Sequence, residues 1–85
     1  MAKKEAFGAE PSDEAIARAR PIALEAIGFG KQKDDKPLSA LGFDTESLSG
    51  LAQDLRRLGV NINDGPILVC KTVLDVIKAV ARVNG

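Results

Sequence analysis

The segment between Asp44 and Gly59 carries the clearest pattern in the sequence and constrains the fold most. Its apolar residues recur every three or four positions, at Leu48, Leu51, Ala52, Leu55 and Leu58. This spacing places them on one face of an α-helix, and that face must pack against other elements. Asp44, Thr45 or Ser47 can cap the start of the helix, and Gly59 supplies a left-handed stop at its end.

An earlier segment shows the same helical period. Ser12 is a capping residue at its start and Gly28 ends it. The apolar positions between them are Ile16, Ala19, Ile22, Ala23, Leu24 and Ile27. Pro21 lies inside the pattern, and proline removes a backbone donor and clashes with the preceding turn. We therefore expect a kink or a break in this helix over residues 17–21.

The C-terminal part of the chain predicts a last helix with a short segment before it. Thr72 and Asp75 have the spacing of a capping box ahead of a helix expected over residues 73–83. Residues 60–66 form a turn-rich connector, and residues 67–70 are expected to form one helical turn or an extended segment. No segment of useful length alternates as a strand does, so the predicted fold class is all-α, a small helical bundle.

The remaining segments flank or connect these helices. Residues 1–11 have no sustained period and are expected to form a flexible N-terminal arm. A long solvated loop over residues 28–37 separates the first two helices, and the apolar residues after it, beginning with Leu38, are expected to anchor it on the core. A chain of 85 residues is too short for two ordinary domains. Residues 12–85 are therefore expected to form a single helical domain.

Composition argues against several kinds of site. The sequence has 12 Lys+Arg, 12 Asp+Glu and no His, so its formal net charge is zero. A neutral chain lacks the basic footprint of a dedicated nucleic-acid-binding protein. Without His, and with a single Cys, it also lacks the residues of zinc fingers and of imidazole catalysis, so we expect neither a metal site nor an enzyme. Cys70 follows three apolar residues and is expected to be a buried small hydrophobic residue.

The sequence also bears on location. No stretch approaches the roughly 18 apolar residues of a membrane span, and the first residues lack the apolar core of a signal peptide. A single Cys cannot form an internal disulfide that would argue for secretion. We therefore expect a cytoplasmic monomer that binds neither membranes nor nucleic acids.

Three motifs resemble those of acyl carrier proteins, the small four-helix carriers of fatty-acid and polyketide synthesis. Residues 38–44, Leu-Ser-Ala-Leu-Gly-Phe-Asp, resemble the lead into the family's second helix. Residues 59–62 resemble the segment after that helix, and residues 72–77 resemble the opening of the last one. The motifs occur in the family's order. The resemblance runs over residues 38–80 and implies a four-helix bundle of acyl-carrier type, with a long first loop and a short third helix.

The resemblance also implies a modified hydroxyl at the start of the second helix. In the family an Asp is followed directly by Ser and Leu, and the phosphate of 4'-phosphopantetheine esterifies the serine. This chain has Asp44, Thr45, Glu46, Ser47 and Leu48 there. An alignment without gaps puts Thr45 at the serine's position, whereas keeping the Ser-Leu pair selects Ser47 and implies a local insertion. Ser47 is the preferred attachment candidate and Thr45 the weaker one. Asp44 and Leu48 would be read by a phosphopantetheinyl transferase.

The function that the resemblance implies is a carrier that catalyses nothing itself. It would hold an acyl intermediate, or as the weaker alternative an aminoacyl one, as a thioester on the phosphopantetheine arm for separate fatty-acid or polyketide-type synthase enzymes. The second helix of typical members is acidic, whereas this one carries Arg56 and Arg57 near its end. Charge governs partner choice, so its partners are expected to differ. The alternative is an unmodified adaptor of carrier fold, or another helical interaction module, that binds a partner through this arginine pair.

Overall fold

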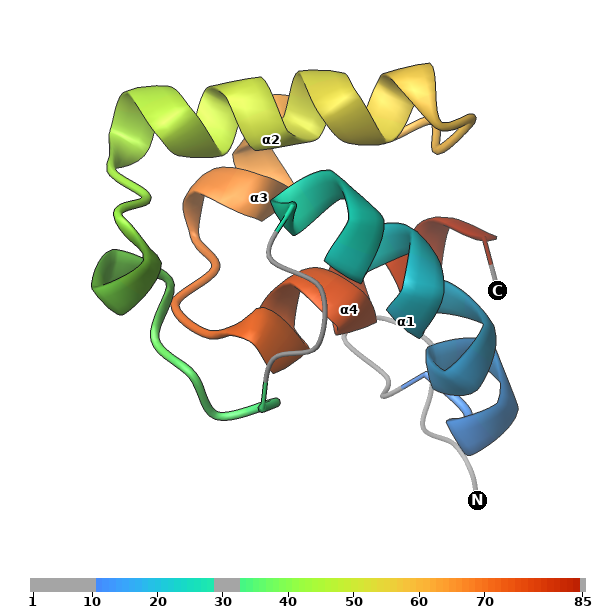
Figure 1. Cartoon of the computed structure of the whole chain (residues 1–85). Helices are drawn as coiled ribbons and strands as arrows, with labels where there is room; N and C mark the ends of the chain where they lie inside the picture. The colour runs from blue at the N-terminus through green and yellow to red at the C-terminus, as the bar shows by residue number, and fades with distance from the viewer. Residues whose placement is uncertain (1–10, 29–32, 85) are drawn as a thin grey trace.

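The computed structural model describes residues 11–28 and 33–84, and within them it shows an all-α domain (Figure 1). The four helices are α1 (Asp13–Ile27), α2 (Thr45–Arg57), the short α3 (Asp64–Leu68) and α4 (Val73–Asn84), and a 3-10 helix, η1 (Leu38–Leu41), precedes α2. The predicted fold class, the short third helix and the long loop between α1 and α2 are confirmed. The predicted N-terminal arm, apart from Pro11, lies outside the described residues.

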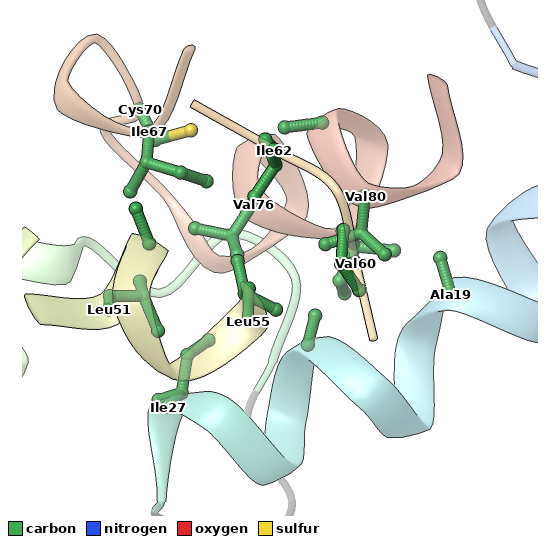
Figure 2. Close-up of a cluster of buried hydrophobic side chains, with 14 of the residues drawn as sticks. Ala19, Ile27, Leu51, Leu55, Val60, Ile62, Ile67, Cys70, Val76 and Val80 are labelled. Atoms are coloured by element: carbon green, nitrogen blue, oxygen red, sulfur yellow. The ribbon is translucent and has the colours of Figure 1, made fainter. Parts of the chain in front are cut away.

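All four helices contribute to one hydrophobic core. α1 packs most extensively on α4, while α2 contacts both α1 and α3. Figure 2 shows side chains from these helices converging in the core. The largest fully buried side chains are Leu38, Leu51, Leu55, Val60, Ile62, Ile67, Val73, Val76, Ile77 and Val80. Among the described residues no polar or charged side chain is buried, and no helix is long and apolar enough to span a membrane.

Helix α1 runs from Asp13 to Ile27 with Pro21 inside it, so of the kink or break expected around this residue, the break does not occur. Ser12 caps its start, because the Ser12 hydroxyl oxygen accepts the N–H of Ala15 at 3.1 Å. Pro21 removes the donor that would serve the Ala17 carbonyl. Both residues lie on the exposed face of the helix, where water can reach that carbonyl. The buried face consists of Ala15, Ala19, Ala23 and Ile27, spaced by four residues.

Helix α3 begins earlier than the sequence predicts. The predicted connector extends through residue 66, but α3 starts at Asp64 with Asn63 as its N-cap. Pro66 is tolerated because the N–H groups of a first helical turn have no intrahelical acceptor. Ile67 is fully buried, so this short helix is held by packing rather than by intrinsic propensity. Of residues 67–70, for which a helical turn or an extended segment was expected, Ile67 and Leu68 belong to α3, whereas Val69 and Cys70 follow its end.

Helix α4 begins with the reciprocal cap that the Thr72–Asp75 spacing predicts. The N–H of Asp75 donates to Thr72 Oγ1 at 3.3 Å. Asp75 Oδ2 in turn accepts the N–H of Lys71 at 2.9 Å and that of Thr72 at 3.1 Å. The hydrogen bond from Lys71, followed by those from Thr72, lowers the pKa of Asp75. The carboxylate is therefore ionised at neutral pH and satisfies two backbone donors ahead of the helix.

The loop before η1 satisfies the next two donors of α4. The N–H of Val73 donates to the Lys36 carbonyl at 3.0 Å, and that of Leu74 donates to the Asp34 carbonyl at 2.9 Å. Arg20 of α1 forms a two-point ion pair with the Asp34 carboxylate, in which Nη2 and Oδ2 lie 3.1 Å apart. The loop that leads to α2 is therefore fixed to both α1 and α4.

We expect Asp75→Ala to lower the free energy of unfolding by about 1–2 kcal/mol, as losses of helix caps do. A lowered native pKa also means that the wild-type carboxylate contributes its stabilisation above its unfolded pKa of about 4 and loses it as the pH falls through the lower native value. The variant should therefore lose less stability on acidification. Urea unfolding followed by circular dichroism at neutral and acid pH measures both effects. Asp35→Ala, at an exposed loop position, is the matched control, and equal losses in the two variants would contradict the prediction.

Candidate functional site

The first turn of α2 contains the residues that the sequence marks as an attachment site. Asp44 is the N-cap, and its Oδ1 accepts the N–H of Ser47 at 2.9 Å. The predicted cap is thus supplied by Asp44. Hydrogen bonding from Ser47 lowers the pKa of Asp44, so this carboxylate is ionised at neutral pH. Thr45 and Ser47 are the first and third residues of the helix, and both hydroxyl groups belong to the same turn.

Both candidate hydroxyl residues are open to solvent. Thr45, Glu46 and Ser47 are exposed, as is Asp44. A modifying enzyme requires a residue that it can reach from solvent, and both residues are exposed. Leu48 differs from these residues, because only 8% of it is exposed and it belongs to the hydrophobic core. Leu48 packs the first turn of α2 against the core and exposes little surface that a transferase could contact.

Thr45 and Ser47 lie on opposite borders of the buried stripe of α2. Successive helix residues are about 100° apart, so two positions separate these side chains by about 200°. Asp54 and Leu58 follow Ser47 by seven and eleven residues and therefore share its side of the helix. They line a hollow against α1. A group attached to Ser47 would consequently leave α2 on the side of α1.

The side of α2 that carries Thr45 faces α3. Ser49 Oγ donates to Asp64 Oδ2 at 2.7 Å. Arg56 Nη1 donates to Asp64 Oδ1 at 3.0 Å and to the Ile62 carbonyl at 2.8 Å. The bond from Ser49, followed by that from Arg56, lowers the pKa of Asp64. These hydrogen bonds form a polar tie between α2 and α3, and a group attached to Thr45 would leave α2 beside it.

This polar tie was not foreseen from the sequence. Ser49 and Asp64 are 15 residues apart, and their contact depends on where α3 begins. Asp64 was predicted to lie in a turn, where aspartate is common. A Ser or Asp on a helical segment carries no spacing signal for a tertiary partner.

The two arginines predicted to bind a partner have different surroundings. Arg56 is engaged by α3, so its guanidinium group has a structural role. Arg57 pairs with Asp54 at 3.2 Å within one turn, and its side chain is 76% exposed. Exposed pairs of this kind contribute about 1 kcal/mol or less, so a partner can displace them at little cost. Arg57 is therefore the cleaner position at which to test partner binding by charge reversal.

Leu58 and Cys70 were both predicted from the sequence to be buried. Leu58, predicted in the buried stripe, is 40% exposed because it caps the end of α2, where the chain turns at Gly59 with a φ of +96°. Cys70 is 8% exposed and its thiol donates to the Pro66 carbonyl at 3.2 Å. Burial raises the pKa of Cys70 to about 11. The interpretation of Cys70 as a buried hydrophobic residue is confirmed.

Comparison with known proteins shows a sequence similarity to a segment of a synthetase. Over 73 residues, 86% of its length, the chain is 34% identical to a segment of Nonribosomal peptide synthetase 2 of Gibberella zeae. The chain is similar to a small piece of that enzyme. It spans 2% of the synthetase's length. No protein-family model and no solved structure matches the chain. The similarity and the four-helix fold are consistent with a carrier-like domain.

Proposed function

We propose that this chain is a carrier domain that holds an intermediate on a covalent 4'-phosphopantetheine arm for separate synthetase enzymes. The observation that carries the proposal is the position of Ser47, an exposed residue in the first turn of α2. It stands in a four-helix domain whose sequence is similar to a segment of a peptide synthetase. In this proposal the chain supplies an attachment point and a recognition surface, and the chemistry is performed by other proteins.

The surroundings of Ser47 are compatible with a phosphodiester. A helix N-terminus presents N–H groups and the positive end of the helix dipole, which favour an attached anion. Asp44 already accepts the N–H of Ser47, and Glu46 adds a second exposed carboxylate. The phosphate would therefore extend into solvent instead of docking on the helix end. The thiol at the far end of the arm forms the thioester. Because the arm would be attached on the solvent-exposed side of the helix, that thiol would be free to move between enzymes.

The cargo we propose is an aminoacyl or peptidyl group. The similar protein is a nonribosomal peptide synthetase, which supports this choice. The fatty-acid or polyketide cargo predicted from sequence rests on the motif resemblance alone. The proposed partners are accordingly a phosphopantetheinyl transferase and peptide-synthesising enzymes.

We expect the wild-type chain to gain the mass of one phosphopantetheine group when it is incubated with coenzyme A and a broad-specificity phosphopantetheinyl transferase. Intact-protein mass spectrometry measures the gain. Omission of the transferase is the control for spontaneous adducts on Cys70. A known carrier loaded in the same reaction shows that the enzyme is active. An unchanged mass for this chain in that reaction would contradict the proposal.

The alternative function is an unmodified adaptor that retains the carrier fold. It is favoured by the departure from the Asp-Ser-Leu motif, since Thr45 and Glu46 stand between Asp44 and Ser47. An adaptor would show no mass gain while remaining folded by circular dichroism, so the loading experiment separates the two functions.

A further inference from the structure

A hollow of about 210 Å³ lies where the last turn of α1 meets the end of α2 (Figure 1). Among the described residues, Glu25 and Ala26 of α1 line it, together with Asp54, Arg57 and Leu58 at the end of α2. Sites that enclose a whole small molecule have volumes of roughly 300–1,000 Å³. This hollow is smaller, so it fits one end of a longer ligand.

The hollow lies on the side of α2 from which a group attached to Ser47 would leave. At 1.5 Å per residue, Asp54 is about 10 Å and Leu58 about 16 Å along the helix from Ser47. An extended phosphopantetheine chain spans distances of this size. The thioester end of an arm on Ser47 can therefore reach the hollow while the arm remains attached at the first turn of α2.

The surface of α2 between Ser47 and the hollow is open at Gly50. Glycine inside a helix costs about 1 kcal/mol relative to alanine. Packing does not require it here, because a Cβ built on Gly50 meets no neighbouring group of the described structure within 4 Å, and its φ is not positive. Gly50 follows Ser47 by three residues and is its neighbour on the helix surface. The missing side chain therefore leaves room for an arm that runs from Ser47 toward Asp54.

The lining of the hollow combines an apolar side chain with an uncompensated carboxylate. Leu58 is a large hydrophobic residue, yet it is 40% exposed there. Asp54 and Arg57 compensate each other in their ion pair. Within residues 11–28 and 33–84, the Glu25 carboxylate forms neither an ion pair nor a hydrogen bond. A group that suits this lining has a small apolar part with a positive charge beside it.

We propose that the hollow receives the aminoacyl group carried on the Ser47 arm, with its side chain against Leu58 and its ammonium group toward Glu25. The inference rests on the proposed carrier function. It narrows the cargo to a single aminoacyl group with a free amine, because a peptidyl group is larger and has an uncharged amide in place of that amine. Glu25 and Arg57 are exposed, so the hollow is open and the cargo can leave it to enter an enzyme.

The test uses the isotope-labelled full chain, loaded by a phosphopantetheinyl transferase from hydrolysis-stable coenzyme A analogues. One analogue carries a leucyl group, and the other carries a 4-methylpentanoyl group, which has the same carbon skeleton without the amine. Intact-protein mass confirms loading. Amide chemical shifts in NMR at about pH 6, below the usual pKa of an α-amino group, then locate the cargo. Relative to the chain that bears phosphopantetheine alone, we expect the leucyl group to shift the amides of Ala26, Asp54 and Leu58, and the 4-methylpentanoyl group to shift them less.

Three variants test the contacts. Glu25→Gln should reduce the shifts caused by the leucyl group about two- to fivefold, the range for loss of one exposed ion pair. Glu14→Gln removes an exposed carboxylate at the other end of α1 and should leave these shifts unchanged. Ala26→Leu fills the hollow and should abolish the shifts at Asp54 and Leu58. If this last variant does not fold, the two glutamate variants still decide.

The outcomes separate this inference from the carrier function. Shifts confined to the first turn of α2, equal shifts for the two cargoes, or shifts that persist undiminished in Glu25→Gln would each overturn the proposed contact. Complete loading without shifts at the hollow contradicts this inference alone. Absence of loading contradicts the carrier function, and with it the inference that rests on it.

Discussion

The Ser47→Ala variant is expected to gain no mass under conditions that load the wild-type chain completely. The substitution removes the single oxygen to which the phosphate would be bonded. It keeps the backbone N–H that Asp44 accepts, so the cap of α2 is retained. Alanine is also the best helix former, and the site is exposed. The loss of loading should therefore occur without loss of structure, which circular dichroism and intact-protein mass measure on the same sample.

Thr45→Val is the matched control for this prediction. Valine keeps the branched shape of threonine and removes only the other hydroxyl of the same helical turn. We expect this variant to load as the wild-type chain does. Loading of Ser47→Ala together with failure of Thr45→Val would move the attachment to Thr45 and to the side of α2 that faces α3. Loading of both single variants would contradict Ser47 as the single attachment point.

Helix ends were predictable where the responsible contacts are local. Asp44 caps α2 through a residue three positions away, and Thr72 and Asp75 cap each other at the same separation. Such contacts need no knowledge of the fold, so sequence spacing locates them. Gly59 likewise ends α2 through its own backbone conformation. Local spacing placed Thr45 and Ser47 in the first turn of α2, whereas their role as attachment candidates came from the resemblance to carrier proteins.

The features that were missed depend on tertiary contacts. The sequence Asp64-Gly65-Pro66 favours a turn, yet burial of Ile67 and the bond from Ser49 to Asp64 make it the start of α3. The apolar period predicted that the buried stripe of α2 extends to Leu58, which lies beyond the last residue of the helix. The rule that proline interrupts a helix describes an isolated helix. It does not take into account that Pro21 lies on a solvent-exposed face.

The neighbour that each hydroxyl of α2 faces can be identified only when the positions of α1 and α3 are known. Spacing alone shows that Thr45 and Ser47 flank the apolar stripe, but it does not identify the neighbour on each flank. The exposure of Val69 was missed for a related reason. Val69 belongs to an apolar run that resembles core, and its exposure follows from the short length of α3. Exposure of this kind depends on where a helix ends, which tertiary contacts decide.

Leu55→Ala is expected to lower the free energy of unfolding by about 2–5 kcal/mol, the range for truncation of a buried leucine. Leu55 is fully buried in α2, and its removal leaves a cavity in the core. Domains of this kind are stable by about 5–15 kcal/mol, with small ones toward the lower end, so this loss approaches the limit of folding. Urea unfolding followed by far-UV circular dichroism measures it, because the chain has no Trp or Tyr to report by fluorescence.

Leu58→Ala provides a matched control on the same element. It makes the same chemical change three residues later, at a side chain that is 40% exposed, and we expect a loss of about 0.5 kcal/mol or less. A uniform apolar stripe, as the sequence period alone predicts, would give equal losses at the two positions, and that result would contradict the boundary of α2 described above. If Leu55 anchors α2, the truncation also lowers phosphopantetheine loading in proportion to the unfolded fraction. Loading should then recover under conditions that restore folding, whereas the loss in Ser47→Ala should not.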